Sequence, residues 1–279
     1  MPQRPKIAGI IRSIRANDGT KLEYEIVGSG PPLVMLHGLL ANRFTFSRQR
    51  EVLAEHYQLV LLNFRGSAGS NDPLPSDYGV GTSDLDNLRA VLDTEKLDRV
   101  SLFAHSSGGA TAFLFATQSP ERVDRAVLLE PTLTRLMPPT EHTRITAENE
   151  KIAAIAEAKG PGACLHAAVE SMGGASWAKL DLDTQKDRLK GLAGSAPFVG
   201  PHLRSLNALA VTEDNVLTLR PRALLLYGAN SFWFEKFIAD RFRTLRPDLP
   251  VLTVEDASHN VHRDQADIVN AEVMAFLTN

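Results

Sequence analysis

The stretch RVSLFAHSSGG, residues 99–109, decides the fold that this sequence predicts. Residues 100–103 are a short, mostly apolar run, which is typical of a strand covered on both faces of a sheet. A turn too tight for bulky residues follows, and we expect a helix to begin at about Ser107. Residues 104–108 have the pattern small–x–Ser–x–small, with Ala104 and Gly108 as the small residues. This pattern predicts a strained strand-to-helix turn that raises the hydroxyl of Ser106 above the sheet.

Small residues on both sides of Ser106 are expected because the helix that leaves such a turn crosses close to neighbouring strands. Backbone strain of about 1–3 kcal/mol is retained where function requires it. Taken alone, the motif leaves a plainer alternative open, namely a loop rich in Ser and Gly before a helix. The rest of the chain therefore has to decide between the two.

Strands and helices alternate on both sides of this stretch. Residues 7–15 and 21–27 predict an antiparallel hairpin around the turn at Asn17-Asp18-Gly19. Short apolar runs then predict buried strands at 33–36, 59–63, 100–103, 123–129, 223–227 and 251–254. Helical patterns lie between them, at 46–56, 82–92, 107–118, 234–243 and 264–277. This alternation predicts an α/β fold with a mostly parallel, doubly wound sheet.

From residue 131 to about residue 219 the alternation stops. Helical patterns occur near 148–159, 162–171 and 203–210, and Gly-rich breaks are expected at 173–174 and 191–200. Because this segment lies between two sheet strands, we interpret it as a helical cap over the carboxyl edge of the sheet, where open α/β sheets bind their ligands. The predicted domains are a core of residues 1–130 and 220–279 and a cap of residues 131–219.

Composition limits the possible partners. The chain has 279 residues, 43% hydrophobic and 23% charged, which suits one large α/β domain with an insertion. A net charge of −3 without a Lys/Arg run makes nucleic acid and anionic membrane surfaces poor partners. The single cysteine, Cys164, excludes an intramolecular disulfide and a cysteine-based metal site.

We expect a cytoplasmic protein, because the first ten residues lack an apolar signal region and no apolar run approaches the ~18–20 residues of a membrane span. No dinucleotide-binding or Walker glycine pattern is present, so we expect neither a cofactor nor a metal, and the partner is a small-molecule substrate. The sequence does not determine the oligomeric state, and a homodimer is one of the states that it allows.

Four separate stretches together resemble the α/β-hydrolase superfamily. His37-Gly38-Leu39 follows the strand at 33–36, as an HG-x motif follows the third strand in that family. Residues 63–70, NFRGSAGS, resemble the family's D-x-R-G-x-G-x-S turn with Asn in place of the leading Asp. Residues 104–109 match the nucleophile elbow, and Ala257-Ser258-His259 stands where the family has its catalytic histidine. The resemblance implies the α/β-hydrolase fold and a Ser-His-acid site.

In that family the serine of the elbow is the nucleophile, which implies Ser106 here. A free hydroxyl attacks poorly and needs an adjacent base to accept its proton. His259 has the order that the family requires, after the nucleophile and after the last strand, and His262 is its competitor. The resemblance makes His37 a structural residue of the HG motif, and it places His105 in the elbow, pointing away from the nucleophile.

The acidic residue of the site is not at the position where most members of the family have it. Most relatives have an Asp three residues after the Gly that ends the penultimate strand, but here Gly228 is followed by Ala229, Asn230 and Ser231. Some branches place the acid one strand earlier, which implies Glu130 after the strand at 123–129. An unpaired buried carboxylate would also be costly, so Glu130 needs a partner. The alternatives are a solvated Glu130, Glu235 as the acid, or a dyad without an acid.

Backbone N–H groups of Leu39 and Ser107 are implied as the oxyanion hole, and Arg65 as a structural arginine. Apolar side chains on loops and in the cap segment are candidates for the substrate pocket, although core packing is as good an interpretation for any one of them. They are Leu39, Leu40, Leu133, Leu136, Met137, Trp177, Phe198, Phe232 and Trp233. As a group they favour a substrate with an apolar acyl or ring portion.

The leading hypothesis is a serine hydrolase of carboxylic esters or lactones that works through an acyl-enzyme. Glu130-Pro131-Thr132 resembles a segment of Ser-Glu-His lactonases of this fold, which slightly favours a lactone. A second hypothesis is a C–C hydrolase, a lyase or a cofactor-free dioxygenase on the same fold. A third is a hydrolase-like receptor for a small ligand. The fold alone does not decide among them.

Overall fold

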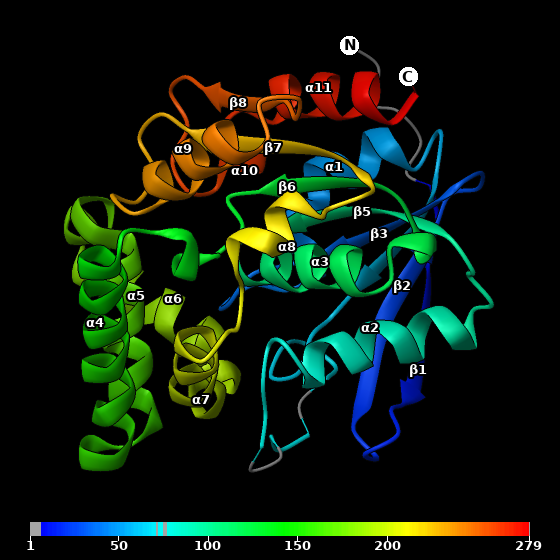
Figure 1. Ribbon diagram of the computed structural model, residues 1–279. Helices are drawn as coiled ribbons and strands as arrows, with labels where there is room; N and C mark the ends of the chain where they lie inside the picture. Colours follow the sequence, from blue (N-terminus) through cyan, green and yellow to red (C-terminus); the bar gives the residue numbers. More distant parts are fainter. Residues whose placement is uncertain (1–6, 71, 75–76, 279) are drawn as a thin grey trace.

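The computed structural model describes residues 7–70, 72–74 and 77–278, and these form one eight-stranded sheet flanked by helices (Figure 1). The strand order is β1-β2-β4-β3-β5-β6-β7-β8. β1 pairs antiparallel with β2 and β2 pairs antiparallel with β4, whereas every other pair is parallel. The predicted α/β fold with a mostly parallel sheet is therefore confirmed. The strands are β1 (Ile10–Arg15), β2 (Lys21–Val27), β3 (Pro32–Leu36), β4 (Gln58–Leu62), β5 (Val100–His105), β6 (Val123–Leu129), β7 (Arg222–Gly228) and β8 (Val251–Val254).

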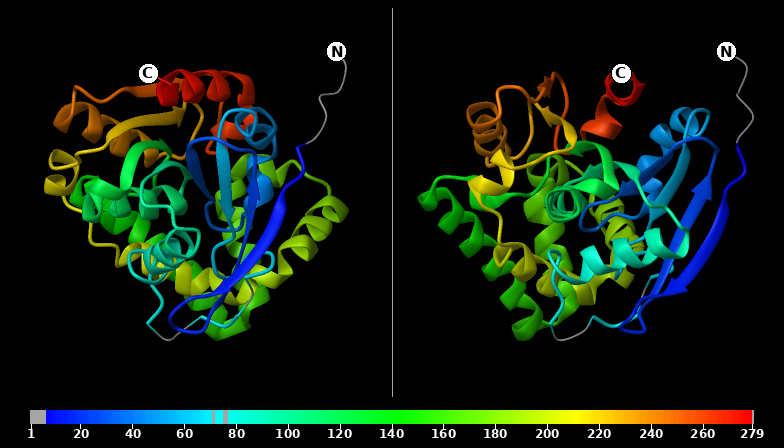
Figure 2. Two further views of the ribbon diagram at one scale, coloured as in Figure 1. Left: turned by 90° about the vertical axis from the view of Figure 1, so that its right-hand side faces the viewer. Right: turned by 45° about the vertical axis from the view of Figure 1, so that its right-hand side comes forward.

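Helices cover both faces of the sheet, which explains why every residue of the central strand β5 is buried. Successive residues of β5 point to opposite faces: Leu102 belongs to the core beneath α2, α3 and α9, and Phe103 to the core beneath α1 and α11. Figure 2 shows these two layers from the side. The covering helices are α1 (Ser47–Leu53), α2 (Ser83–Thr94), α3 (Ser107–Gln118), α9 (Glu235–Leu245), α10 (Val261–Asp264) and α11 (Ala266–Thr278).

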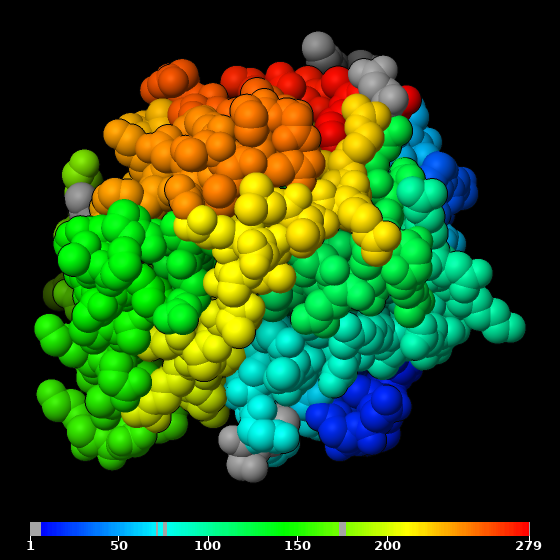
Figure 3. All heavy atoms as spheres, viewed as in Figure 1, coloured from blue at the N-terminus to red at the C-terminus, as the bar shows by residue number. Residues whose placement is uncertain are grey.

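Between β6 and β7 the chain forms a helical insertion, which stands beside the end of the sheet where β6 ends (Figure 1). It has a small core of its own around Leu165 and Val199. In the space-filling view the segment that returns from the insertion to β7, coloured yellow, runs diagonally across the face shown (Figure 3). The helices of the insertion are α4 (Pro139–Lys159), α5 (Pro161–Ala178), α6 (Leu182–Leu192), α7 (Ala196–Asn207) and α8 (Glu213–Leu217).

The expected Gly-rich breaks of the insertion are wrong in detail. α5 continues through residues 173–174, and α7 contains Gly200 in its interior. A Cβ on Gly200 would lie 3.5 Å from the carbonyl oxygen of Ala153 and 3.6 Å from the Cβ of Ala156. These are ordinary van der Waals distances, so α7 packs directly on α4 at this position, and that packing compensates for the low helix propensity of Gly200. Helix α6, which the sequence pattern did not predict, fills part of the second expected break.

Two glycines provide a matched test of the packing beneath the elbow. A Cβ on Gly108 would lie 2.4 Å from the carbonyl oxygen of His37 and 2.6 Å from that of Leu36, so Gly108→Ala forces backbone to move. We expect it to lower the free energy of unfolding by about 2 kcal/mol or more. A Cβ on Gly191 in α6 would have no atom within 4 Å, so Gly191→Ala should raise the free energy of unfolding by about 0.5 kcal/mol. Urea unfolding measures both, and equal stability of the two variants would contradict the close approach.

Candidate active site

Ser106 occupies the turn between β5 and α3 in a strained backbone conformation, with φ 55° and ψ −123°. Positive φ is costly for a residue with a Cβ, so neighbouring segments have to hold it. The Ser106 N–H donates to the carbonyl of Leu129 at 2.9 Å, and the Thr132 N–H donates to the carbonyl of Ser106 at 3.1 Å. Across the turn, a Cβ on Gly38 would lie 2.8 Å from the Cβ of Ser106, so only glycine fits there. The predicted strained turn is present.

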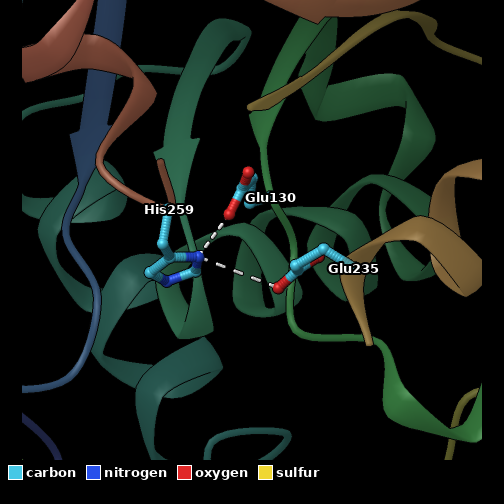
Figure 4. Close-up of side chains that lie close together, drawn as sticks. All are labelled: Glu130, Glu235 and His259. Atoms are coloured by element: carbon cyan, nitrogen blue, oxygen red, sulfur yellow. Dashed lines mark hydrogen bonds and ion pairs between the residues drawn. The ribbon is translucent and has the colours of Figure 1, made fainter. Parts of the chain in front are cut away.

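Glu130 and His259 meet where β6 and β8 end (Figure 4). An oxygen of the fully buried Glu130 carboxylate forms a hydrogen bond with Nδ1 of His259. The same oxygen accepts the hydroxyl proton of Ser231 at 2.5 Å, and the other accepts the N–H of Gly228 at 2.7 Å. Because a carboxylate only accepts hydrogen bonds, Nδ1 of His259 carries the proton and Nε2 is left as a proton acceptor.

Two further contacts hold His259, one through its backbone and one through its ring. Nε2 of His105 donates to the backbone carbonyl of His259 at 2.8 Å. The ring of Phe232 stacks on the His259 ring, with centroids 4.4 Å apart. In this conformation the Ser106 hydroxyl is paired with the hydroxyl of Thr132 at 3.3 Å rather than with His259. Catalytic hydrogen bonds often tighten only when substrate is bound, so this geometry leaves the pairing of Ser106 and His259 open.

The other histidines of this region hold structure. His262 is buried, and its Nε2 lies 3.0 Å from the hydroxyl of Thr45. In His37, Nε2 accepts the N–H of Phe64 at 3.0 Å, and Nδ1 donates to the carbonyl of Gly38 at 2.8 Å. Burial lowers the pKa of His37 to about 4 and that of His262 to about 3, so both rings are neutral near pH 7. The geometry thus favours His259 over His262 as the partner of Glu130.

Glu235, the alternative acid, is the first residue of α9 and lies 3.9 Å from Nδ1 of His259 (Figure 4). Neither of its buried oxygens has a hydrogen-bond partner in the described part of the chain. Burial and the charge of Glu130 raise the pKa of Glu235 well above its usual value, which favours the neutral form of Glu235. Ligand atoms of Glu130, Glu235 and His259 lie within 4.8 Å of one another and could hold a cation, but a cation would displace the Nδ1 proton.

A pocket opens next to the elbow, between the HG loop, the turn at 64–67 and α7. Its lining includes Leu39, Leu40, Ser107 and Phe198, four of the residues singled out from the sequence. The rest of the lining consists of His37, Gly38, Ala41, Phe64, Arg65, Gly66, Ser67, Ser195 and His202. Arg65 also has the structural contacts expected of it, since it donates to Thr20 and Asn87 and pairs with Asp18.

The other predicted pocket residues lie elsewhere. Phe232 stacks on His259, whereas Leu133, Leu136 and Met137 are buried in the core above α3. Trp177 packs edge-on against His166 inside the insertion, and Trp233 lies under the guanidinium of Arg144 at 4.1 Å. Ser231 and Thr132 were not predicted as site residues, but Ser231 contacts Glu130 and Thr132 contacts Ser106. Ser231 had one signal, because it stands where most of the resembling family has its acid.

Comparison with known proteins places this fold in a family. A family model described as the alpha/beta hydrolase fold matches residues 31–265. The chain belongs to the α/β-hydrolase fold family. Among the described residues, no helix has both the length and the apolar character needed to cross a membrane.

A Bacillus subtilis protein, provisionally named a 2-succinyl-6-hydroxy-2,4-cyclohexadiene-1-carboxylate synthase, is 27% identical over 96% of this chain and 98% of its own length. Uncharacterized mycobacterial proteins, from Mycobacterium bovis and Mycobacterium tuberculosis, are 31% identical over 41% of this chain, and the match spans a third (33%) of their length.

Two solved structures share the fold over nearly the whole chain. An esterase from Thermogutta terrifontis with malate bound superimposes with a TM-score of 0.77 at 19% identity, covering 96% of this chain and 98% of its own. The enol-lactonase from Burkholderia xenovorans superimposes with a TM-score of 0.75 at 20% identity, covering 96% and 100%. At these identities the likeness establishes the fold alone.

Buried titratable groups predict how stability depends on pH. Four buried histidines have a lowered pKa because burial disfavours the charged ring: His37, His105, His202 and His262. Each therefore takes up a proton on unfolding below pH 6.5. Burial raises the pKa of Asp84 to about 7 and that of Glu235 well above its usual value, so each releases a proton on unfolding.

On unfolding, the four histidines take up about four protons, and Asp84 and Glu235 release about two, so the net uptake is about two protons. The free energy of unfolding should therefore fall by up to about 3 kcal/mol as the pH drops from 6 to 5. Urea unfolding at several pH values measures the slope. Asp84→Asn removes one opposing group and should make the slope steeper. A stability that stays level or rises toward pH 5 would show that these groups are not held neutral.

Proposed function

We propose that this hydrolase cleaves a carboxylic ester or lactone with an apolar portion, through an acyl-enzyme on Ser106. His259 is the general base and Glu130 the acid that orients it. The observation that carries the proposal is the buried Glu130 carboxylate, which accepts hydrogen bonds from His259 Nδ1, the Ser231 hydroxyl and the Gly228 N–H. These three donors compensate for burying the charge, and they leave the carboxylate aimed at the edge of the imidazole that a Ser-His-acid site requires.

The reaction begins when Oγ of Ser106 turns from Thr132 toward His259, attacks the carbonyl carbon and gives its proton to Nε2. The charge of Glu130 stabilises the imidazolium that forms. Backbone N–H groups of Leu39 and Ser107, both on the pocket wall, donate to the developing oxyanion. His259 then returns the proton to the leaving oxygen. Water, activated by the same imidazole, attacks the acyl-enzyme and releases the acid.

The pocket supports an apolar substrate portion, because Leu39, Leu40 and Phe198 line it beside Ser107. Residues 131–219 act as the cap of the site in this proposal, and α7 provides one of its walls. The esterase and the enol-lactonase that share the fold are consistent with ester or lactone chemistry. A p-nitrophenyl ester series assayed beside a lactone panel tests the substrate class.

The second candidate is chemistry without an acyl-enzyme, as in a C–C hydrolase, a lyase or a cofactor-free dioxygenase. The Bacillus subtilis relative that matches over almost the whole chain has the name of a synthase, which favours this candidate. Ser106→Ala separates the two mechanisms. Acyl-enzyme hydrolysis should lose nearly all turnover, whereas chemistry that uses only His259 as a base retains a substantial part. Wild-type enzyme should also be labelled by a fluorophosphonate, and Ser106→Ala should not. Absence of labelling in folded wild-type protein favours a receptor.

Glu130→Gln should lower kcat by about 10⁴-fold with little change in KM, because the neutral amide no longer stabilises the imidazolium or selects its tautomer. Steady-state kinetics on the best p-nitrophenyl ester measure this effect. Glu235→Gln is the matched control, since Glu235 is already neutral, and its kcat should stay within a few-fold of wild type. A near-normal kcat for Glu130→Gln together with a large loss for Glu235→Gln would move the acid to Glu235.

Ser231→Ala removes one of the three donors to Glu130 without touching the imidazole. A hydrogen bond to a charged group contributes about 1.5–3 kcal/mol, so we expect kcat to fall by roughly 10- to 100-fold. The neighbouring Asn230→Ala leaves the backbone hydrogen bond from residue 230 to Ala257 in place and should have almost no effect. Equal kinetics of the two variants would remove Ser231 from the acid's support.

A further inference from the structure

A buried chain of three polar side chains links the core of the protein to the helical insertion. Asp84 lies in the first turn of α2, Tyr78 in the preceding loop, and His202 in α7. The hydroxyl of Tyr78 lies 2.9 Å from Oδ2 of Asp84 and 3.0 Å from Nδ1 of His202. Asp84 is 1% exposed and His202 is 8% exposed. Nothing in the proposed acyl-transfer reaction uses these groups.

His202, at one end of this series of hydrogen-bonded side chains, lies at the pocket beside the elbow. His202 lines the pocket together with Gly38, Leu39 and Ser107, which surround the elbow. Nε2 of His202 is buried and has no hydrogen-bond partner among the described residues, and the same holds for Oδ1 of Asp84 at the other end. A buried polar atom without a partner costs about 1–3 kcal/mol, and His202 is one of the residues that line the pocket, so this nitrogen is available to a ligand atom that completes its hydrogen bonding.

The phenol of Tyr78 has a single proton, which couples the two ends of the chain. When Asp84 is charged, the Tyr78 hydroxyl donates to it, Nδ1–H of His202 donates to the Tyr78 oxygen, and Nε2 is a bare acceptor. When Asp84 is protonated, every hydrogen bond reverses. Asp84 donates to Tyr78, Tyr78 donates to Nδ1, and Nε2 of His202 carries the proton and becomes a donor.

We propose that Asp84, Tyr78 and His202 form a substrate-recognition relay, in which His202 Nε2 binds a hydroxyl or carbonyl oxygen of the substrate remote from the scissile bond. The proton on Asp84 selects whether Nε2 donates or accepts. The relay rests on the proposed function and deepens it by adding a polar contact to the substrate. It predicts an ester or lactone that carries a phenol, an alcohol or a ketone.

The charges around the relay allow this exchange near neutral pH. Burial raises the pKa of Asp84 to about 7, opposed by the Tyr78 hydrogen bond and the charge of Arg65. Burial lowers the pKa of His202 to about 3, with a further contribution from His37, so its ring changes tautomer without becoming charged. Burial and the charge of Asp84 keep the phenol of Tyr78 protonated throughout.

The tautomer of His202 is measured directly in protein labelled with ¹⁵N-histidine, with its resonances assigned by their loss in His202→Gln. As the pH rises through about 7, we expect the proton to move from Nε2 to Nδ1, which exchanges the ¹⁵N shifts of the two nitrogens. In Asp84→Asn the amide donates to Tyr78 at every pH, so the Nε2–H form should persist. Tyr78→Phe should abolish the pH dependence. A tautomer that ignores pH in the wild type, or one that responds equally in all three proteins, overturns the relay.

Ligand recognition is tested in Ser106→Ala protein with phenol as the probe and toluene as its apolar match. Phenol should produce a saturable shift of the Nε2 resonance of His202, and toluene at the same concentration should not. Equal responses to both, or none to phenol, overturn the recognition of an oxygen atom. Because neither measurement involves turnover, their failure is distinct from a failure of Ser106 as the nucleophile.

Discussion

The buried contact between the Glu130 carboxylate and His259 is the constraint on which the rest of the site depends. A carboxylate taken out of water is stable only where charged or polar donors replace the solvent, and loss of one partner leaves a costly unpaired charge. Here the donors come from the end of β7, from the residues just after it, and from the loop after β8. The requirement for these donors therefore fixes three strand ends relative to one another. The parallel order β6-β7-β8 makes this possible, because it brings their carboxyl ends to the same edge.

Backbone strain is concentrated at the same edge. Ser106 has φ 55° and Glu130 has φ 45°, and both residues carry side chains that disfavour this conformation. The Glu130 N–H donates to the carbonyl of Leu226 at 3.0 Å, and the Ser106 N–H donates to that of Leu129 at 2.9 Å. Neighbouring strands thus hold both residues in place, while glycines at 38 and 108 leave room for the elbow. Strain of this kind persists only where the surrounding packing determines it.

In the proposed mechanism, the requirement for an acid beside the imidazole has more than one geometric solution on this fold. β6 and β7 are neighbours in register, with Leu129 opposite Leu226, so a side chain after either strand reaches the same imidazole edge. In this chain the carboxylate follows β6, and Ser231, after β7, supplies a hydroxyl to it instead of an acid. Glu235 lies nearby and stays neutral, because two buried carboxylates so close together cannot both be charged at low cost.

The sequence by itself determined the elements of the core and the kind of residue at its reactive edge. Short, mostly apolar runs predicted β6 and β8 at their observed bounds, and the small residues around Ser106 predicted the elbow. Only the tertiary structure decided which side chains meet. Glu130 and His259 are 129 positions apart, and Tyr78 and His202 are 124 apart, so their contacts depend on strand order and helix packing. Local sequence patterns carry the period of a strand or helix, but they contain no information on which distant donor satisfies a buried acceptor.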